Sequence, residues 1–341
     1  MTKAIHQFER LPQVEPPAAG ANDVALVPVR AQPLVGVIRN ARSHRNGGDT
    51  GLAATENVIL HTPQRRSELP QILADLAKRR VDCIAIDGGD GTVRDVITCG
   101  AGVFGTHWPK LIVLPSGKTN ALAHDLGIPV DWTLHDAVKA IGDGRIETRR
   151  PMVIAQADNR QAQVHGFVMG GGAFTRAIAL GQRSHKLGAF NAAVVGMTTV
   201  WSVAQALLGR QSNAWRRGTR MRVRDASGAD LPHLGGLPEQ ERYLVFASTL
   251  RGFPAGLNPF RRVDGPVKLA LLDNPRRGLL LRMGALARGT ASEATLRRGA
   301  HIVEGEAFRV DIGGNFVLDG EIFPAGDYCL TAGEALRFVV P

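Results

Sequence analysis

The sequence predicts two halves, an α/β domain built on a parallel sheet and then an antiparallel β-sandwich. In residues 34–149, short apolar stretches alternate with amphipathic helical stretches, as in parallel sheets covered by helices. In residues 150–341, short strands follow one another, and Gly-, Pro- and Asp-rich turns separate most of them, which is typical of a sandwich. With 341 residues and 44% hydrophobic content, the chain is long enough for two cores.

Residues 1–33 are predicted to be a disordered tail outside both halves. Prolines stand at positions 12, 16, 17, 28 and 33 among alanines, and such a stretch cannot bury enough surface to fold alone. The first ten residues lack the apolar core of a signal peptide. The three cysteines, Cys83, Cys99 and Cys329, are far apart and imply neither a disulfide framework nor a zinc site. We therefore expect a cytoplasmic protein.

The first half is organised around a glycine loop. The apolar run 81–86 has the character of a buried parallel strand, and it leads into Gly88-Gly89-Asp90-Gly91-Thr92 before a helical run begins at Val93. Glycine lets bare backbone N–H groups approach phosphate oxygens, and a helix start adds unpaired donors and a positive dipole end. Asp90 would repel phosphate unless it holds a metal ion or a ligand hydroxyl. The loop is interpreted as a nucleotide site, with a tight strand–helix turn capped by Asp90 as the alternative.

A second loop, at 115–119, follows the next predicted strand. Its Gly117-Lys118-Thr119 is similar to the end of a Walker A loop, but the first glycine of that pattern would fall at Ile112, so it is not a P-loop. Both loops follow parallel strands, whose carboxyl ends share one edge of a sheet, so they should face the same crevice. The other elements expected in this half are strands at 34–38, 57–61 and 111–114 and helices at 67–80, 118–126 and 134–141.

The second half is predicted to be mainly β. Its expected strands are 152–155, 164–169, 221–224, 243–247, 267–271, 308–312, 316–318, 328–331 and 336–340. One uncharged helical stretch, 187–209, interrupts them and places Phe190, Met197 and Trp201 on roughly one face. It is too polar for a confident membrane span, so it either caps the sandwich or contacts lipid.

The net charge of +10 suggests an anionic partner. Aromatic residues make up only 5% of the chain, and no basic run is interleaved with them, so nucleic acid is not expected.

Taken together, the two loops resemble the diacylglycerol kinase catalytic family, which includes bacterial lipid kinases and the sphingosine and ceramide kinases. Residues 88–92 match its G-G-D-G-T, and 115–123 resemble its P-x-G-T-x-N-x-x-A. Three further segments resemble motifs of the family. Leu318-Asp319-Gly320-Glu321 resembles its late D-G-E, and Asn40-Ala41-Arg42-Ser43 resembles its N-P-x-S. Asp264-Gly265 resembles the D-G that precedes a sandwich strand. The resemblance covers residues 34–341. G-G-D-G-T alone is shared with NAD kinases, whereas the ordered set is much more specific.

The resemblance implies a first half similar to NAD kinase and phosphofructokinase, with ATP and Mg²⁺ in a cleft between the halves. An ATP-dependent kinase acting on the primary hydroxyl of a lipid, diacylglycerol or a ceramide or sphingoid base, is then expected. The resemblance assigns the phosphate contacts to Gly88, Gly89, Gly91 and Thr92. It assigns Asp90 to the network that binds Mg²⁺ and the nucleotide. Glu321 is the candidate general base, with Asp319 beside it. The rest of the nucleotide cradle is expected from Asn40, Thr62, Gly117, Lys118, Thr119 and Asn120.

Two residues depart from the family pattern, and one further metal is implied. Lys118 stands where the family has threonine, with Thr119 one place on, and could supply a cation to a triphosphate. Ala41 replaces a proline, which affects turn rigidity more than chemistry. A structural Mg²⁺ at Asp264 is also implied by the resemblance.

Two other functions remain open. A NAD kinase would share the fold and G-G-D-G-T, but its usual N-E pair is absent; a non-catalytic basic binding protein would not need Asp90 and Glu321. Because the expected acceptor is insoluble in water, we predict peripheral association with the inner membrane surface through basic residues and the 187–209 stretch. A homodimer is possible on the sequence.

Overall fold

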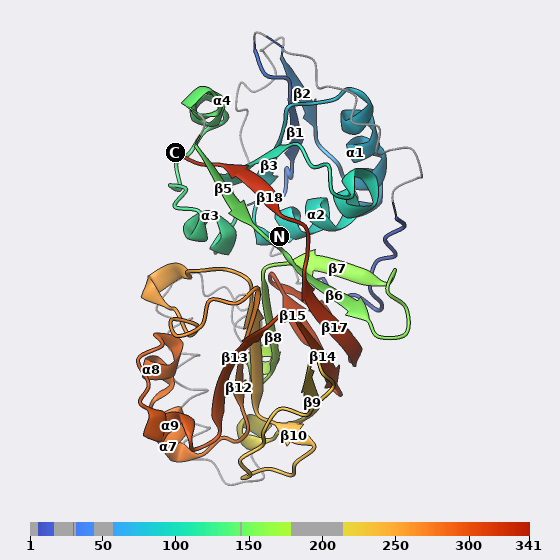
Figure 1. The fold of residues 1–341 in the computed structure, drawn as a ribbon. Helices are drawn as coiled ribbons and strands as arrows, with labels where there is room; N and C mark the ends of the chain where they lie inside the picture. Colours follow the sequence, from blue (N-terminus) through green and yellow to red (C-terminus); the bar gives the residue numbers. More distant parts are fainter. Residues whose placement is uncertain (1–5, 17–29, 31, 44–56, 144, 179–213) are drawn as a thin grey trace.

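The computed structural model describes residues 6–16, 30, 32–43, 57–143, 145–178 and 214–341. Figure 1 shows two halves stacked end to end, an α/β half above and a β half below. The fold class predicted from the sequence is confirmed.

The α/β half contains one six-stranded sheet in the order β2-β1-β3-β4-β18-β5. Neighbours are parallel from β2 to β18, whereas β5 runs antiparallel to β18. Apolar clusters lie on both faces, one filled mainly from α1, α2 and α3 and the other from α4. The strands are β1 (Val35–Arg39), β2 (Val58–His61), β3 (Cys83–Gly88), β4 (Lys110–Pro115), β5 (Ile146–Arg149) and β18 (Leu336–Val339). The helices are η2 (Arg66–Glu68), α1 (Leu69–Lys78), α2 (Asp90–Phe104), α3 (Ala121–Asp125) and α4 (Leu134–Asp143).

The C-terminal strand β18 belongs to this sheet, so its predicted place in the sandwich was wrong. Leu336, Phe338 and Val339 are all at most 1% exposed, because β18 lies between β4 and β5 with apolar clusters on both faces. The chain thus returns from the second half to complete the first. Strand β5, beside it, was not predicted, since its Ile-Glu-Thr-Arg sequence is polar and it forms an edge.

The β half is an antiparallel sandwich of two six-stranded sheets. Its core is one cluster that draws on both sheets, including Met152, Val245, Phe316 and Tyr328. The first sheet, β10-β9-β14-β17-β6-β7, contains β6 (Met152–Gln156), β7 (Gln163–Gly166), β9 (Thr219–Asp225), β10 (Glu241–Arg242), β14 (Ala307–Ile312) and β17 (Gly326–Ala332). The second, β13-β12-β11-β8-β15-β16, contains β8 (Val168–Gly172), β11 (Leu244–Ser248), β12 (Val267–Leu272), β13 (Ala300–Gly305), β15 (Phe316–Leu318) and β16 (Glu321–Phe323).

The strand expected at 164–169 is two strands in different sheets. It breaks at Phe167, so that β7 pairs with β6 and β8 pairs with β11 and β15. Short helices outside the sandwich, which were not predicted, are η3 (Ala214–Arg216), η4 (Pro254–Gly256), α7 (Arg277–Leu280), α8 (Met283–Ala287) and α9 (Glu293–Leu296).

Residues 6–16 are folded, contrary to the prediction of a tail. Leu11 is 1% exposed and belongs to the sandwich core, and Phe8 stacks on Phe323 with ring centroids 4.4 Å apart. Bridges at Gln7 and Gln13 add this segment to the edge strand β16 and to the β6–β7 turn. The prediction failed because these apolar residues are too few to form a core alone, but they complete one that the sandwich provides.

The remaining tail residues, 1–5, 17–29 and 31, and the 187–209 stretch lie outside the described residues. Among the described residues, no helix has the length and apolar character needed to span a membrane.

Candidate active site

The glycine loop joins β3 directly to α2, which begins at Asp90 and not at the predicted Val93. Gly89 is the N-cap, and its carbonyl accepts from the N–H groups of Thr92 and Val93. A Cβ on Gly88 would lie 2.5 Å from the Thr92 side chain, so the turn has room only for glycine there. At Gly91, by contrast, such a Cβ would make ordinary van der Waals contacts, 3.8 Å from the Arg94 guanidinium and from the Asp319 carbonyl oxygen. The first turn of this 15-residue helix thus lies against the β15–β16 turn, and its N-terminal end offers backbone N–H groups and the positive end of the helix dipole to an anion.

The second loop lies against the first, as the sequence predicted. A Cβ on Gly117 would come within 2.5 Å of the Gly89 Cα, so the two backbones touch only because both residues are glycine. Asn120 braces this loop, since its side chain accepts from the Gly117 N–H and donates to the Gly117 carbonyl, both at 3.0 Å. Its left-handed backbone, with φ of 48°, delays α3 to Ala121 instead of the predicted 118. The Asn120 side chain therefore fixes the conformation of the second loop through hydrogen bonds within that loop.

Asp90 connects the two loops. One carboxylate oxygen accepts from the Leu122 N–H at the start of α3, at 3.3 Å. Burial raises the pKa of Asp90, and the nearby backbone N–H groups of α3 partly oppose that rise. Burial thus disfavours the charged form of Asp90, and a nearby cation would stabilise that form.

Asn40 and Thr92 are brought together below the loop. The Asn40 side-chain amide donates to the Thr92 hydroxyl at 2.9 Å, and the Asn40 N–H donates to the Asp87 carbonyl. Asp87, which the sequence analysis missed, is 4% exposed, accepts from the Ser116 hydroxyl and pairs with Arg39 at 3.6 Å. Asp87 therefore links the carboxyl ends of β1, β3 and β4 next to the two glycine loops. A carboxylate at the end of a buried strand was the available signal.

The turn between β15 and β16 brings Asp319 to the glycine loops from the other half of the chain. Its carboxylate accepts from the N–H groups of Phe167 and Val168, where β7 gives way to β8, at 2.9–3.2 Å. Burial, with a smaller contribution from the charge of Asp90, raises the pKa of Asp319 to about 7. The structure thus joins Asp90 and Asp319, which are far apart in the sequence.

Glu321 lies on the other side of the same turn. Its carboxylate accepts from the His6 N–H and is close enough to Arg94 for that charge to lower its pKa, although burial has the larger effect and the net direction is upward. Phe8 lies next to it, with the Arg66 guanidinium 4.2 Å from the centre of its ring. The N-terminal segment therefore covers this side of the turn.

Arg94 is the main residue that the sequence analysis missed. It is 1% exposed, and it donates to the Leu318 carbonyl at 3.2 Å and to Asp95 at 2.7 Å. It therefore locks the β15–β16 turn onto α2. The sequence did contain a signal for a functional role of Arg94: it is a charged residue one helical turn after Asp90, on a face that is otherwise apolar.

Three predicted cradle residues lie at the surface. Lys118 and Thr119 are exposed on the second loop, next to Gly117. Thr62 is exposed directly after β2, at the same edge of the sheet, and its carbonyl accepts from the Gln64 side chain.

Asp264 does not join the other site residues. It is exposed, and its N–H and that of Gly265 both donate to the Glu304 carboxylate. In the part of the chain that the structure describes, no group of three or more His, Cys, Asp or Glu side chains could hold a metal ion. The Glu304 carboxylate thus binds the backbone of this turn, and a structural Mg²⁺ at Asp264 stays a prediction.

Known proteins resemble this chain in part of its sequence and in its fold. Residues 48–154 match the family model described as Diacylglycerol kinase catalytic domain. The chain is similar to a crystal structure of a diacylglycerol kinase from Bacillus anthracis str. Sterne, with 16% identity, a TM-score of 0.62, and coverage of 92% of this chain and 99% of that one. Two further structures from that organism have 14% and 17% identity, TM-scores of 0.61 and 0.60, the same 92% coverage of this chain, and 99% and 98% coverage of theirs. No functionally curated protein matches the chain.

The likeness to solved structures, at 14–17% identity, establishes the fold, and the family model covers the part of the chain that contains both glycine loops. The resemblance expected from the motifs is thereby confirmed: this chain carries a diacylglycerol kinase catalytic-domain match on the fold of bacterial diacylglycerol kinases.

Proposed function

We propose that the protein is an ATP-dependent lipid kinase that transfers the γ-phosphate to the primary hydroxyl of a lipid, either diacylglycerol or a ceramide or sphingoid base. The observation that carries this proposal is the meeting of two glycine loops, in backbone contact at Gly89 and Gly117, with Asp90 and Asp319 beside them. Phosphoryl transfer requires positioned phosphates, neutralised charge and an oriented hydroxyl, and little covalent chemistry.

The phosphates would lie along the first turn of α2. Its N-terminal N–H groups and positive dipole end favour anions. Lys118, exposed on the facing loop, would add a cation. These groups position and neutralise the triphosphate.

Mg²⁺ would be held by Asp90. Magnesium at nucleotide sites usually takes one or two carboxylates, with phosphate and water oxygens completing the shell, so this carboxylate suffices. Burial raises the pKa of Asp90, so its ionised form would gain from a cation. The ion would supply charge neutralisation at the transferring phosphate.

We assign the general base to Asp319 in preference to Glu321, which the sequence favoured. A base works best with a pKa near the working pH, and the pKa of Asp319 is about 7. Asp319 is also near enough to Asp90 for that charge to add to the rise of its pKa, whereas Glu321 lies on the other side of the turn and accepts from the His6 N–H. Glu321 is then a positioning residue, which orients the turn that carries Asp319.

The test is ATP-dependent phosphorylation of a lipid panel in mixed micelles, with NAD⁺ as the competing acceptor and Asp90→Asn as the control. Phosphorylation of one lipid class by the wild type but not by the variant is expected. Preferred phosphorylation of NAD⁺ would identify a NAD kinase, and inert behaviour on every acceptor would favour a non-catalytic basic protein. Mass spectrometry of a lipid extract treated with labelled ATP would name the acceptor.

A further inference from the structure

The positive charge of the protein is concentrated in one stretch. Residues 251–298 contain ten basic and three acidic residues, so they carry seven of the ten net positive charges of the chain. The later part of this stretch, residues 276–298, contains α7, α8 and α9, which Figure 1 shows together along one flank of the β half. Leu279, Leu280 and Leu286 bury the inner side of these helices in a shared apolar cluster. The outer side remains exposed.

We call this outer side the basic flank. It is defined by the exposed residues Arg276, Arg277, Leu281, Arg282, Arg288, Arg297 and Arg298. Leu281 is 70% exposed and follows α7, so an apolar side chain projects between the arginines of positions 277 and 282.

The arginines of the basic flank form no ion pair with any described residue. Residues 179–213, outside the described part, contain no Asp or Glu that could provide one. On the other sandwich sheet, by contrast, the exposed Arg220, Arg222 and Arg309 all pair with aspartates. The basic flank therefore holds uncompensated charge.

Two of these guanidinium groups lie close together. A Cβ on Gly278 would be 3.1 Å from an Arg298 nitrogen and 3.7 Å from an Arg282 nitrogen. Like charges held this near repel each other, and an anionic partner would relieve that repulsion.

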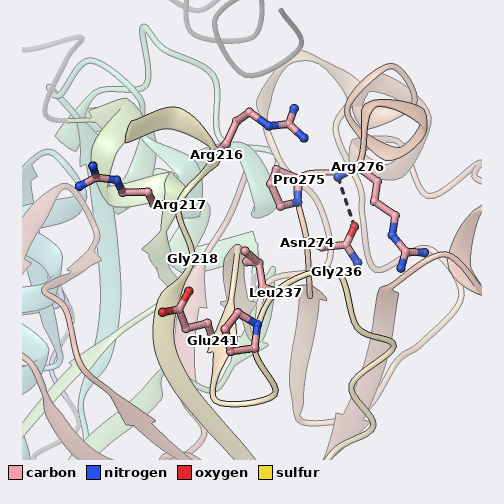
Figure 2. A pocket seen from close by; sticks show the side chains of 10 residues that line it. Arg216, Arg217, Gly218, Gly236, Leu237, Glu241, Asn274, Pro275 and Arg276 are labelled. Atoms are coloured by element: carbon pink, nitrogen blue, oxygen red, sulfur yellow. Dashed lines mark hydrogen bonds between the residues drawn. The ribbon is translucent and has the colours of Figure 1, made fainter. Parts of the chain in front are cut away.

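A cavity of about 590 Å³ opens at one end of the flank and is lined by Arg216, Arg217 and Arg276, among others. Figure 2 shows that these three side chains point in different directions and do not gather around one point. This arrangement does not suit a single small anion. It suits a broad anionic surface.

We propose that the basic flank docks on a bilayer containing anionic phospholipid, with Leu281 entering the headgroup region. The choice of a bilayer as partner rests on the proposed lipid-kinase function and on Leu281, since an exposed leucine among arginines serves a membrane better than a nucleic acid. No aromatic residue occurs in 276–298 to stack on bases.

The test compares two double variants that change the net charge equally, Arg277→Glu with Arg282→Glu, and Lys78→Glu with Arg160→Glu as the control. All four side chains are exposed, and those of the control lie on α1 and on the β6–β7 turn. Sedimentation is measured with vesicles of phosphatidylcholine alone or mixed with phosphatidylglycerol, without nucleotide. Because each basic side chain near an anionic surface contributes about 1 kcal/mol, and the two glutamates add repulsion, the flank variant should bind mixed vesicles at least roughly 30-fold more weakly. The control should keep most of its binding, and about 0.5 M salt should weaken both.

Equal losses in the two variants, or equal binding to both vesicle types, would overturn the proposal. So would tighter binding to an RNA oligonucleotide that the flank variant abolishes. A fluorophore on Leu281→Cys should shift to the blue on mixed vesicles, whereas one on Arg160→Cys should not. Phosphorylation of micelle-dispersed lipid should be unchanged in the flank variant. This readout separates a failure of docking from a failure of the proposed kinase activity.

Discussion

The two sides of the β15–β16 turn differ sharply although Asp319 and Glu321 are two residues apart. On one side, Asp319 accepts from the backbone where β7 becomes β8 and lies near Asp90 and the glycine loops. On the other, Glu321 meets Arg94 and the N-terminal segment. Burial raises the pKa of both carboxyl groups, and the Arg94 guanidinium opposes that rise in both. The charge of Asp90 adds to the rise in Asp319, whereas the His6 N–H further opposes it in Glu321.

This difference teaches that a short motif does not assign chemical roles. In Asp319-Gly320-Glu321 the resemblance indicated Glu321 as the base, whereas the surroundings of the two acids favour Asp319. The turn, with positive φ at both Asp319 and Gly320, directs them to opposite surroundings. Variants of residues on each side of the turn can therefore distinguish a catalytic role from a role in positioning the turn.

The largest effect is expected from Asp90→Asn on the Asp319 side. Turnover should fall by at least about 10²-fold, since loss of one charge at the transferring phosphate costs about 3 kcal/mol of transition-state stabilisation. Asparagine keeps the oxygen that accepts from Leu122, so the melting temperature should hold. Kinetics and thermal unfolding check both points, and near-normal turnover would remove Asp90 from the catalytic group.

Asp319→Asn should also lower turnover by about 10²-fold, and it has a distinctive pH signature. In the wild type, kcat/KM should rise with pH through about 7 as Asp319 loses its proton. The folded state keeps this proton up to pH about 7, whereas the unfolded chain releases it near 3.8. Wild-type stability from this group therefore falls as the pH rises from 4 to 7.

Asparagine cannot ionise, so the variant should be more stable than the wild type at pH 8 and about equal to it at pH 4. Denaturant unfolding at the two pH values measures this difference. If the difference in unfolding free energy between the variant and the wild type is the same at pH 4 and pH 8, the raised pKa of Asp319 is contradicted.

Glu321→Gln should reduce turnover by at most about 10-fold and leave the pH profile near 7 in place, because Glu321 orients the turn and does not take the proton. The same assay, run beside Asp319→Asn, decides between the two carboxyl groups. If Glu321→Gln is the more damaging change and removes the pH dependence, the base is Glu321, as the sequence first indicated.

Phe8→Ala tests the contribution of the N-terminal segment to the Glu321 side. Loss of its stacking on Phe323 and of its contact with Arg66 should destabilise the fold by about 2 kcal/mol. Gln7→Ala, an exposed neighbour, is the matched control in chemical denaturation. Equal midpoints for the two variants would mean that the segment rests on the surface without stabilising it.

The smallest effect is expected at Lys118, which is exposed on the second glycine loop. Lys118→Thr should raise the KM for ATP a few-fold with little change in kcat, because a ground-state charge contact acts mainly on binding. Lys139→Thr, on the exposed face of α4, serves as the control. Unchanged ATP dependence would show that Lys118 points to solvent.

The sequence by itself determined the fold class and the two glycine loops. Period-2 and period-3.6 apolar patterns are local, and so is the need for glycine at position 88, where a side chain would collide with Thr92. Because both loops follow parallel strands, their shared edge could also be predicted.

Only the tertiary structure decided the rest. The place of β18 and the folding of residues 6–16 depend on partners far away in the chain, since a few apolar residues gain burial only where another element leaves a surface for them. The roles of Asp319 and Glu321 depend on desolvation and on charges contributed by α2, and no spacing within Asp-Gly-Glu encodes those. The motif gives the residue types, and their three-dimensional surroundings set their proton affinities.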